Sequence, residues 1–337
     1  MSKMKKLNKY IILLFLITSA FGVDKAGTTA AKFLSIGVGS KATGMGGAFT
    51  SIADDATAMY WNPAGLSFNK TKEVYFNHAN WIADISFDYF GFTIPMNSKT
   101  TLGFNITSVT MDEMEVTRYG NENTGETFKA ADYAIGSTYA INLTDRFSIG
   151  LNGKYIQQTI ANSHAKGFAL DFGTLFITPF GFRLGTSISN FGSKLMMTGD
   201  DLLIGADVDE NIDGNNESVT GILSTDYFDL PLVLRIGISD EIKVGSKNSF
   251  LWSLDAISPN DNANYINVGS SFSIYDEFLS FYFGINSFAL EKREKELSFG
   301  IGMRLPKIIK NGLLINYSFE TMKFLENTQQ LGLSFNY

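Results

Sequence analysis

The sequence has no cysteine, only six prolines and only two histidines among its 337 residues. The absence of cysteine excludes disulfide bonds and thiolate metal sites. Asp and Glu number 34 against 27 Lys and Arg, so the net charge of −7 provides no basic surface of the kind that nucleic-acid binding requires. The composition therefore excludes disulfide-stabilised and nucleic-acid-binding classes of protein.

Long apolar runs are also missing after the first 22 residues, where no segment reaches the roughly 18 uninterrupted apolar residues of a spanning helix. What the sequence does contain is 29 phenylalanines, 14 tyrosines and 32 glycines, and 45% of its residues are hydrophobic. Aromatic residues favour strands, and a chain this apolar is not disordered. If the mature chain lies in a membrane, it must cross that membrane as strands.

Residues 1–22 have the three parts of a secretory signal peptide. Four lysines precede Tyr10, an apolar core follows over residues 10–17, and Ala20 and Gly22 provide small residues for the cleavage site. We predict cleavage after Gly22, because the apolar core is too short for a spanning helix. No cysteine follows the cleavage site, which excludes a lipid-anchored lipoprotein.

From residue 73 onward, the sequence repeats a unit of about ten residues in which apolar and polar side chains alternate. In one such unit Phe147, Ile149 and Leu151 share one face, while Ser148 and Gly150 share the other. The units predict about fourteen strands, an even number as in bacterial barrels. Their expected bounds are 73–80, 86–97, 99–111, 126–142, 146–161, 164–178, 180–190, 229–240, 248–258, 262–274, 278–288, 296–305, 311–320 and 328–337.

The connections between these strands alternate in length. The long connections, over residues 111–126 and 191–228, fall on one side of the strand count, and short turns such as 142–146 fall on the other. This is the arrangement of an outer-membrane barrel with short periplasmic turns and long external loops. We therefore predict an all-β fold, a transmembrane antiparallel β-barrel of about 14 strands over residues 73–337. It would lie in the bacterial outer membrane, with its apolar faces in contact with lipid.

Two further sets of residues follow from this barrel. The last strand carries Leu333, Phe335 and Tyr337 in alternation, which resembles the C-terminal signal of outer-membrane barrels and implies the barrel assembly machinery as a partner. The polar faces would line the lumen. Five charged side chains on them are candidates to contact whatever fills it: Lys154, Asp171, Arg235, Asp255 and Arg304.

Residues 23–72 do not alternate, and we expect them to form a plug or hatch for the lumen. Small residues are frequent over 37–47, which allows close backbone packing. We expect a short helix to begin within Ala26–Phe33 and a second over 53–60 with Asp54 as its cap. Residues 62–65 (NPAG) predict a turn, because Pro63 favours extended geometry at Asn62.

The run FLSIGVGSKATGMGGAFTSIADDATAMYWNPAGLSF, residues 33–68, closely resembles the N-terminal region of the PorV/PorQ family of outer-membrane proteins. More distantly, ADDATAMYWNPAGL resembles the hatch of FadL-type long-chain fatty-acid transporters, which are fourteen-stranded barrels. The close resemblance covers about 40 residues of the chain. It implies a plug or hatch motif made of Gly44, Gly46, Gly47, Asp54, Asp55, Trp61, Asn62, Pro63, Ala64 and Gly65.

Three other patterns could in principle carry chemistry. Residues 37–42 match a loosened dinucleotide fingerprint, but the required βαβ context is missing, so close packing explains these glycines better. Asp54 and Asp55 have no nearby histidine or nucleophile for acid–base work, which favours capping or a tie between hatch and wall. Ser163 adjoins His164, yet a working pair is defined by distance in space and not by adjacency. We therefore predict a protein that is not an enzyme and has no cofactor.

The acidic loop over 191–228 contains the opening of a calcium loop, in which Asp209, Asn211 and Asp213 would supply the oxygen ligands. The closing glutamate is absent, because Thr220 stands in its place. The alternative is an ordinary solvated external loop, and the sequence leaves both readings open.

The resemblance implies two alternative functions. PorV-like members act in protein export or surface attachment through the type IX secretion system and receive exported proteins that carry a C-terminal sorting domain. FadL-like members take up a hydrophobic small molecule, which would here lie between the hatch and apolar lumen residues such as Ile156, Leu175 and Val233. We favour the first function. A lumen sealed beneath a broad loop surface would support it, and a continuous apolar tunnel to a gap in the wall would support the second.

Overall fold

The computed structural model describes residues 27–120, 124–207, 219–288, 290, 293–305 and 312–337. The expected signal peptide over 1–22 lies outside the described residues, and so do the calcium candidates Asp209, Asn211 and Asp213. Within the described ranges, no helix is long and apolar enough to cross a membrane.

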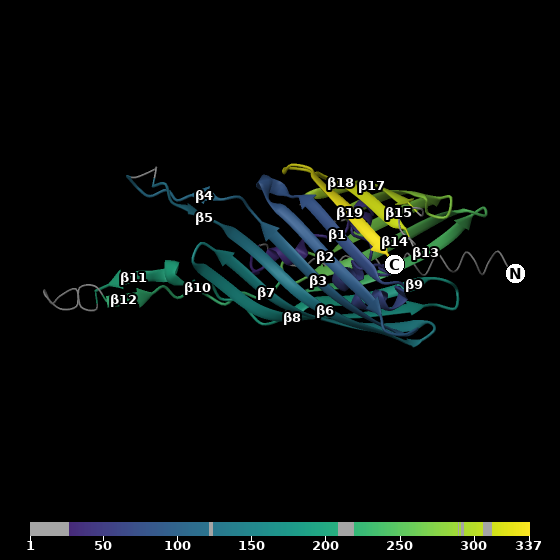
Figure 1. The fold of residues 1–337 in the computed structure, drawn as a ribbon, viewed down its shortest axis with the longest axis horizontal. Helices are drawn as coiled ribbons and strands as arrows, with labels where there is room; N and C mark the ends of the chain where they lie inside the picture. The colour runs from purple at the N-terminus through teal and green to yellow at the C-terminus, as the bar shows by residue number, and fades with distance from the viewer. Residues whose placement is uncertain (1–26, 121–123, 208–218, 289, 291–292, 306–311) are drawn as a thin grey trace.

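Fourteen antiparallel strands form a closed barrel, in which β1 pairs with β19 and β8 pairs with β9 (Figure 1). The prediction of the fold and of each of its strands is confirmed. The barrel strands are β1 (Glu73–Asn80), β2 (Ser86–Pro95), β3 (Thr100–Thr110), β6 (Ala130–Thr144), β7 (Phe147–Ile160), β8 (Ser163–Ile177), β9 (Arg183–Gly192), β13 (Val233–Val244), β14 (Asn248–Pro259), β15 (Tyr265–Ile274), β16 (Leu279–Phe288), β17 (Lys295–Leu305), β18 (Leu313–Met322) and β19 (Thr328–Asn336).

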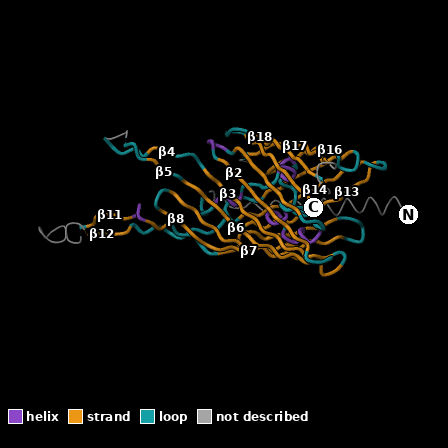
Figure 2. Tube along the Cα trace, viewed as in Figure 1, coloured by secondary structure: helices purple, strands orange, loops and turns teal. Residues whose placement is uncertain are grey.

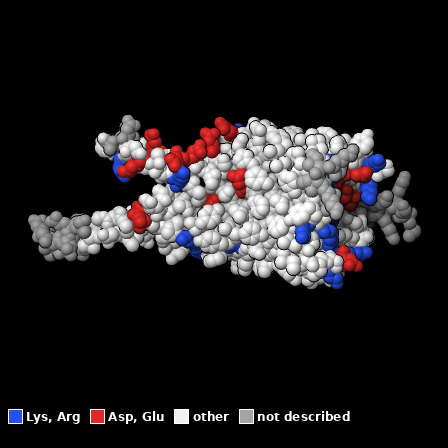
Figure 3. All heavy atoms as spheres, in the orientation of Figure 1, with Lys and Arg blue, Asp and Glu red and all other residues white. Residues whose placement is uncertain are grey.

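The side chains of each strand alternate between the outer surface and the lumen, as the period of two requires. In β8, Phe168 and Phe172 are 67% and 48% exposed on the outside, whereas Ala169 and Asp171 are buried inside. Figure 3 shows the middle of the visible wall as largely free of charged side chains. The apolar faces therefore form a continuous outer band.

The two ends of the barrel differ in their connections. Residues 96–99 and 145–146 are short connections at the end where the C-terminus lies, which we call the turn end. The long connections, 111–129 and 193–232, leave from the opposite end, which we call the loop end. They carry two small hairpins that project beyond the wall (Figure 1): β4 (Met114–Glu115) with β5 (Thr127–Phe128), and β11 (Leu203–Ala206) with β12 (Val219–Ile222). The extra strand β10 (Thr198–Gly199) pairs with the end of β8 and is followed by η4 (Asp200–Leu202). The short helix η3 (Ile82–Asp84) connects β1 to β2.

Residues 27–72, which we call the hatch, lie inside the barrel with four short helical elements (Figure 2). They begin near the loop end, where Lys32 pairs with Asp261, and end at the turn end, where Tyr337 N donates to Lys72 O. Their elements are η1 (Lys32–Ser35), α2 (Ser40–Gly44), α3 (Ala58–Trp61) and η2 (Pro63–Phe68).

Of two local expectations for the hatch, one is confirmed and one is wrong. A short helix does begin within Ala26–Phe33, as the single 3-10 turn η1 that starts at Lys32 after Ala31, whose backbone is left-handed (φ 49°). Asp54 does not cap a helix. Asp55 instead accepts from Thr57 N at 2.8 Å, ahead of α3. Packing against the wall determines this chain path more than helix propensity does, because elements this short have little stability of their own.

Candidate functional site

Trp61 is the largest buried side chain at the centre of the hatch, with only 5% of its surface exposed. Its ring makes edge contacts with Phe49 and Tyr60, at centroid distances of 6.2 and 4.9 Å. Its indole Nε1 donates to Val38 O at 2.8 Å. The indole therefore joins three separate parts of the hatch, and its polar atom is satisfied despite burial.

The hatch backbone contacts the wall at glycines on several strands. A Cβ atom added to any of these glycines would overlap hatch backbone atoms, so only glycine allows the approach. Gly150 and Gly173 lie against Pro63–Ala64, Gly185 lies against Thr50–Ser51, and Gly269 and Gly284 lie against Met45–Gly46. The two sides fit each other through backbone contact on widely spaced strands of the barrel.

The glycines expected in the hatch motif take part in the same packing. A Cβ atom added to Gly44 would lie 3.3 Å from Gly300 Cα. Gly46 and Gly47 have φ of +67° and +69°, a backbone conformation that residues with a side chain rarely adopt. Gly65 lies directly against Ala53 O. These four positions therefore have packing or conformational reasons to be glycine. None of them belongs to the dinucleotide fingerprint over residues 37–42.

Asn62 links the hatch to itself and to the wall. Its amide Nδ2 donates to Thr50 O at 2.8 Å and to Thr174 O on β8 at 3.0 Å, and its Oδ1 accepts from Ala64 N. Pro63 and Ala64 follow at the start of η2, where they contact the strands around them. The turn expected over residues 62–65 is thus a fixed point between the hatch and β8.

Of the five lumen charges expected from the sequence, two contact the hatch. Arg235 is buried, and its guanidinium lies over the rings of Tyr60 and Trp61 at 5.5 Å from each centroid. Asp255 is also buried and accepts from Thr50 N at 2.9 Å. These contacts hold α3 and the preceding loop against β13 and β14.

The other three lumen charges pair within the barrel. Lys154 and Asp171 form a buried ion pair at 2.9 Å between β7 and β8. Arg304 pairs with Glu277 at 2.7 Å at the turn end. None of these three groups is the partner of Asp54 or Asp55; the expected tie between hatch and wall forms instead between Asp54 and Arg183 of β9.

The sequence reasoning missed the residues that hold the hatch at the turn end. The Asp54 carboxylate lies between two cations, with Oδ1 at 4.0 Å from Lys41 Nζ and Oδ2 at 3.8 Å from the guanidinium of Arg183 on β9. Glu73, the first residue of β1, accepts from Ala56 N and Asn69 Nδ2 of the hatch and from Ser334 Oγ. Alternation along β9 puts Arg183 on the inner face with Gly185, and this signal could have identified it.

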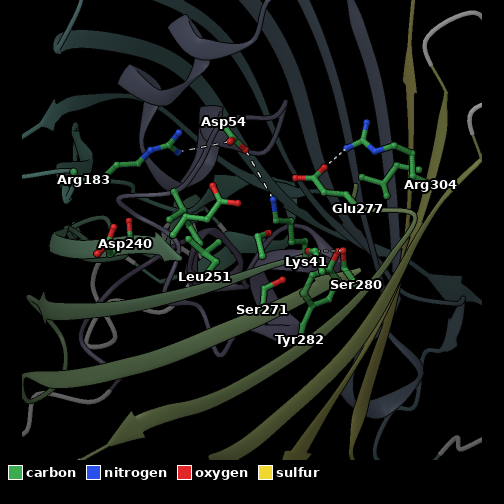
Figure 4. Close-up of a pocket in the computed structure, with 17 residues that line it drawn as sticks. Lys41, Asp54, Arg183, Asp240, Leu251, Ser271, Glu277, Ser280, Tyr282 and Arg304 are labelled. Carbon is green, nitrogen blue, oxygen red and sulfur yellow. Dashed lines mark hydrogen bonds and ion pairs between the residues drawn. The ribbon is translucent and has the colours of Figure 1, made fainter. Parts of the chain in front are cut away.

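These charges border a cavity of about 300 Å³ at the turn end (Figure 4). Lys41 projects into its centre and lies between Asp54 and the Glu277–Arg304 pair. Burial, the largest single effect, lowers the pKa of the Lys41 ammonium, but Asp54, Tyr282, Asp55 and Glu277 together raise it more, so the pKa lies above its usual value. Ser239 Oγ, which also borders this space, is buried and has no hydrogen-bond partner within the described part of the chain.

Replacing Asp54 with asparagine is expected to loosen the turn end of the hatch, because Lys41 and Arg183 then lose the carboxylate between them. The chain has no cysteine, so a single cysteine at the buried Ser51 reports opening through its rate of reaction with a water-soluble maleimide. We expect labelling to be up to about fivefold faster, the range for a partly exposed ion pair. The matched variant Asp145→Asn, in the turn between β6 and β7, should leave the rate unchanged. Equal rates in both variants would contradict the tie.

A second cavity, of about 580 Å³, is a hollow in the outer surface of the wall. It lies over Ser137, which has a small side chain, and Gly153, which has none, so space is left between large apolar neighbours. Those neighbours are Phe104, Ile135, Tyr155, Phe168, Leu170 and Phe191. Lys154, whose ammonium faces the lumen, also borders the hollow, so the wall between hollow and lumen is a single layer here.

The apolar core of the lumen extends to the loop end. It includes Phe33 and Leu34 of the hatch, and also Leu195 and Leu230 of the long connection between β9 and β13. Ile156 belongs to the same cluster. Leu175 and Val233, the other lumen positions expected to contact a hydrophobic ligand, are 1% and 5% exposed. The described interior is thus occupied by protein at the positions where the channel hypothesis places a ligand.

The remaining sequence candidates lie where strand alternation puts them. Leu333 and Phe335 of β19 pair with Phe76 and Val74 of β1, and Lys72 lies over the Tyr337 ring at 6.0 Å. Ser163 Oγ donates to Asp201 at 3.2 Å, so it binds a loop carboxylate and not the adjacent His164. Among the residues described, no group of acidic or histidine side chains could hold a metal ion.

Comparison with known proteins gives one family match. Residues 22–197, slightly more than half of the 337 residues, match the family model of the type IX secretion system protein PorV. No curated protein matches the chain.

Solved structures with the same fold include hydrocarbon transporters. The Ralstonia pickettii toluene transporter TbuX is 11% identical, with a TM-score of 0.57 over 89% of this chain and 98% of that one. The Pseudomonas putida toluene transporter TodX is 10% identical, with a TM-score of 0.57 over 94% and 98%. A Pseudomonas aeruginosa FadL homologue is 13% identical, with a TM-score of 0.50 over 95% and 99%. At these identities, the likeness shows the fold alone.

Proposed function

Because the chain belongs to the family of the type IX secretion system protein PorV, we propose that it is an adaptor that binds exported proteins at the cell surface. Family membership also agrees with the expected class, a non-enzymatic β-barrel of the bacterial outer membrane. In this function the loop end faces the exterior and the turn end faces the periplasm. The exported protein binds to the projecting connections and does not pass through the lumen.

The packed lumen is the observation that carries this proposal. Trp61, Phe49 and Met59 of the hatch are buried inside the barrel, and the wall glycines contact the hatch backbone. The apolar core extends to Leu195 and Leu230 at the loop end. A barrel filled in this way is suited to present a surface, and its projecting hairpins extend that surface beyond the membrane.

Deleting the gene is expected to leave exported proteins with a C-terminal sorting domain unattached to the cell surface. Their amount at the surface, measured by protease shaving of intact cells, should fall by at least about tenfold, since an obligatory binding step would be lost. Complementation with the wild-type gene should restore it. Normal surface attachment in the deletion strain would contradict the adaptor function.

The alternative is a channel for hydrophobic compounds, and the outer hollow over Ser137 and Gly153 favours it. This hollow lies beside Lys154, on the strands that border the lumenal Asp171. In such a function, hydrophobic molecules would leave the lumen through the wall at this place. Faster uptake of radiolabelled toluene or oleate by cells with the gene than by the deletion strain would support the channel, and equal uptake would contradict it.

A further inference from the structure

The hairpin of β11 and β12 is a two-stranded sheet that projects from the loop end (Figure 1). Among the described residues, no other strand pairs with either of its edges. A two-stranded hairpin is only marginally stable in water, and a third strand or an apolar support is needed for independent stability. The hairpin therefore has two open edges and little stability of its own.

The side chains of this hairpin are apolar on both faces and largely exposed. Leu203 and Ile222 lie opposite each other on one face and are 45% and 72% exposed. Ile204 and Val219, on the other face, are 41% and 37% exposed. Neither strand carries a charged residue. Exposed apolar surface of this kind marks an interaction site.

The second hairpin of the loop end, formed by β4 and β5, differs in that charged side chains lie beside its strands. Beside β4 and β5, Lys129 pairs with Glu113 at 2.8 Å and Arg118 pairs with Glu126 at 2.8 Å. Charged side chains on an edge strand prevent it from pairing with another chain. The hairpin of β11 and β12 lacks that protection, although both hairpins project into the same surroundings.

The open edges present unpaired backbone groups. Leu223 N donates to Leu202 O at 2.8 Å, so that pair exchanges hydrogen bonds across the hairpin. Because hydrogen-bonded and non-hydrogen-bonded pairs alternate in an antiparallel ladder, the next pair, Leu203 with Ile222, directs its N–H and C=O groups away from the ladder. The pair of Gly205 with Thr220 does the same. The N–H of Leu203 already donates to Asp200 O. The β12 edge thus offers both groups of Thr220 and Ile222, and the β11 edge offers both groups of Gly205 and the C=O of Leu203.

Carboxylates flank the base of the hairpin and add a charge preference. Asp200, Asp201 and Asp226 lie just before β11 or just after β12, and Asp201 and Asp226 are exposed. Hydrogen bonds from Asn162 lower the pKa of Asp201, so it is ionised at neutral pH. The nearby Lys194 is paired with Asp229 at 3.3 Å. A complementary partner would therefore carry Lys or Arg beside its strand.

We propose that an open edge of this hairpin binds an extended, uncharged strand flanked by Lys or Arg, which adds to β11 and β12 as a third strand. Backbone hydrogen bonds would supply affinity, and the exposed Leu, Ile and Val side chains would pack on alternate residues of the incoming strand. That the strand comes from an exported protein rests on the proposed function. The strand addition itself rests on the hairpin alone.

The test uses purified full-length mature protein in detergent and a fluorescent octapeptide of alternating valine and threonine with lysine at both ends. Thr220→Pro and Gly205→Pro each remove an outward N–H from one edge, so the hairpin keeps its internal bonds. The variant with both prolines is expected to bind the peptide at least about tenfold more weakly, as expected for lost hydrogen bonds. Thr127→Pro is the matched control, since its N–H also points outward, on the hairpin of β4 and β5.

A second peptide with glutamate at both ends should bind more weakly than the lysine peptide, and the difference should shrink in high salt. Hydrogen exchange gives a readout that does not depend on variants, because the added peptide should slow exchange at Gly205 on one edge or at Thr220 and Ile222 on the other. Wild-type binding by the double-proline variant would overturn the proposal, as would unchanged exchange in this hairpin. Surface attachment in the deletion strain tests the proposed function separately, so failure of either one can be told from failure of the other.

Discussion

Replacing Gly284 with valine is expected to displace the hatch from the lumen. A Cβ at this position of β16 would overlap the backbone of Met45 and Gly46, and neither side can move without breaking the strand ladder or the turn. Overpacking in a core costs about 1–3 kcal/mol even where side chains can adjust. Here backbone meets backbone, so we expect a loss at or above the top of that range. Protease cleavage within the hatch of the folded barrel would measure it.

Gly153→Val is the matched control for this prediction. Gly153 lies on β7 and faces the outer hollow, where an added Cβ would meet only Leu170 Cδ2, at an ordinary 3.7 Å. We expect this variant to fold and to keep its hatch protected from protease. Barrel folding itself is read from the mobility shift between heated and unheated samples on SDS gels. Equal protection of the hatch in both valine variants would contradict the conclusion that backbone contact with the wall glycines holds the hatch in the lumen.

The barrel could be predicted from the sequence because its signal repeats. A period of two over ten residues gives the strand and the lumen-facing side at once, and a miscounted strand would have put a long connection at the wrong end. The predicted strand bounds were least accurate where a connection between barrel strands forms a hairpin of its own. Strand β6 begins at Ala130 and not near 126, because residues 127–128 form β5 of the projecting hairpin.

The hatch could be recognised but its contacts could not be derived. Its motif has small residues and short turns with no period, so local rules gave a helix cap at Asp54 that the structure does not have. What determines its path lies on other elements. Arg183 and the wall glycines are distant in sequence, and only closure of the barrel brings them to the hatch.

The wall around Asp171 connects the packed lumen to the projecting hairpin. Pairing of β8 with β9 shifts register between Leu170 and Phe172, and Asn190 has a left-handed backbone (φ 65°) at this point. Asp171 Oδ1 accepts from Asn190 N at 2.7 Å, which holds the bulge in place. Beyond it β9 ends at Gly192, and the connection that carries β11 and β12 begins. We therefore expect the direction of the hairpin to depend on this buried carboxylate.

Replacing Asp171 with alanine is expected to lower the free energy of unfolding by about 3–5 kcal/mol, the usual result of leaving one member of a buried ion pair alone. Lys154, with 10% of its side chain exposed, would lose its carboxylate, and Asn190 N and Asn152 Nδ2 would each lose an acceptor. The double variant Lys154→Met with Asp171→Leu should lose much less, because no charge remains buried. Urea unfolding followed by tryptophan fluorescence in detergent measures both.

The double variant also distinguishes an effect of Asp171 on stability from an effect on the position of the hairpin. If Asp171 sets the bulge, the double variant should regain stability and still bind the lysine-flanked peptide poorly, since Asn190 N has no acceptor to fix where β9 leaves the wall. Lys154→Met alone removes the counter-charge and the hydrogen bond from Lys154 Nζ to Asn190 Oδ1. It keeps the bond from Asn190 N to Asp171 and should leave peptide binding intact. Normal peptide binding by the double variant would show that the hairpin takes its direction from elsewhere, such as the pairing of β10 with the end of β8.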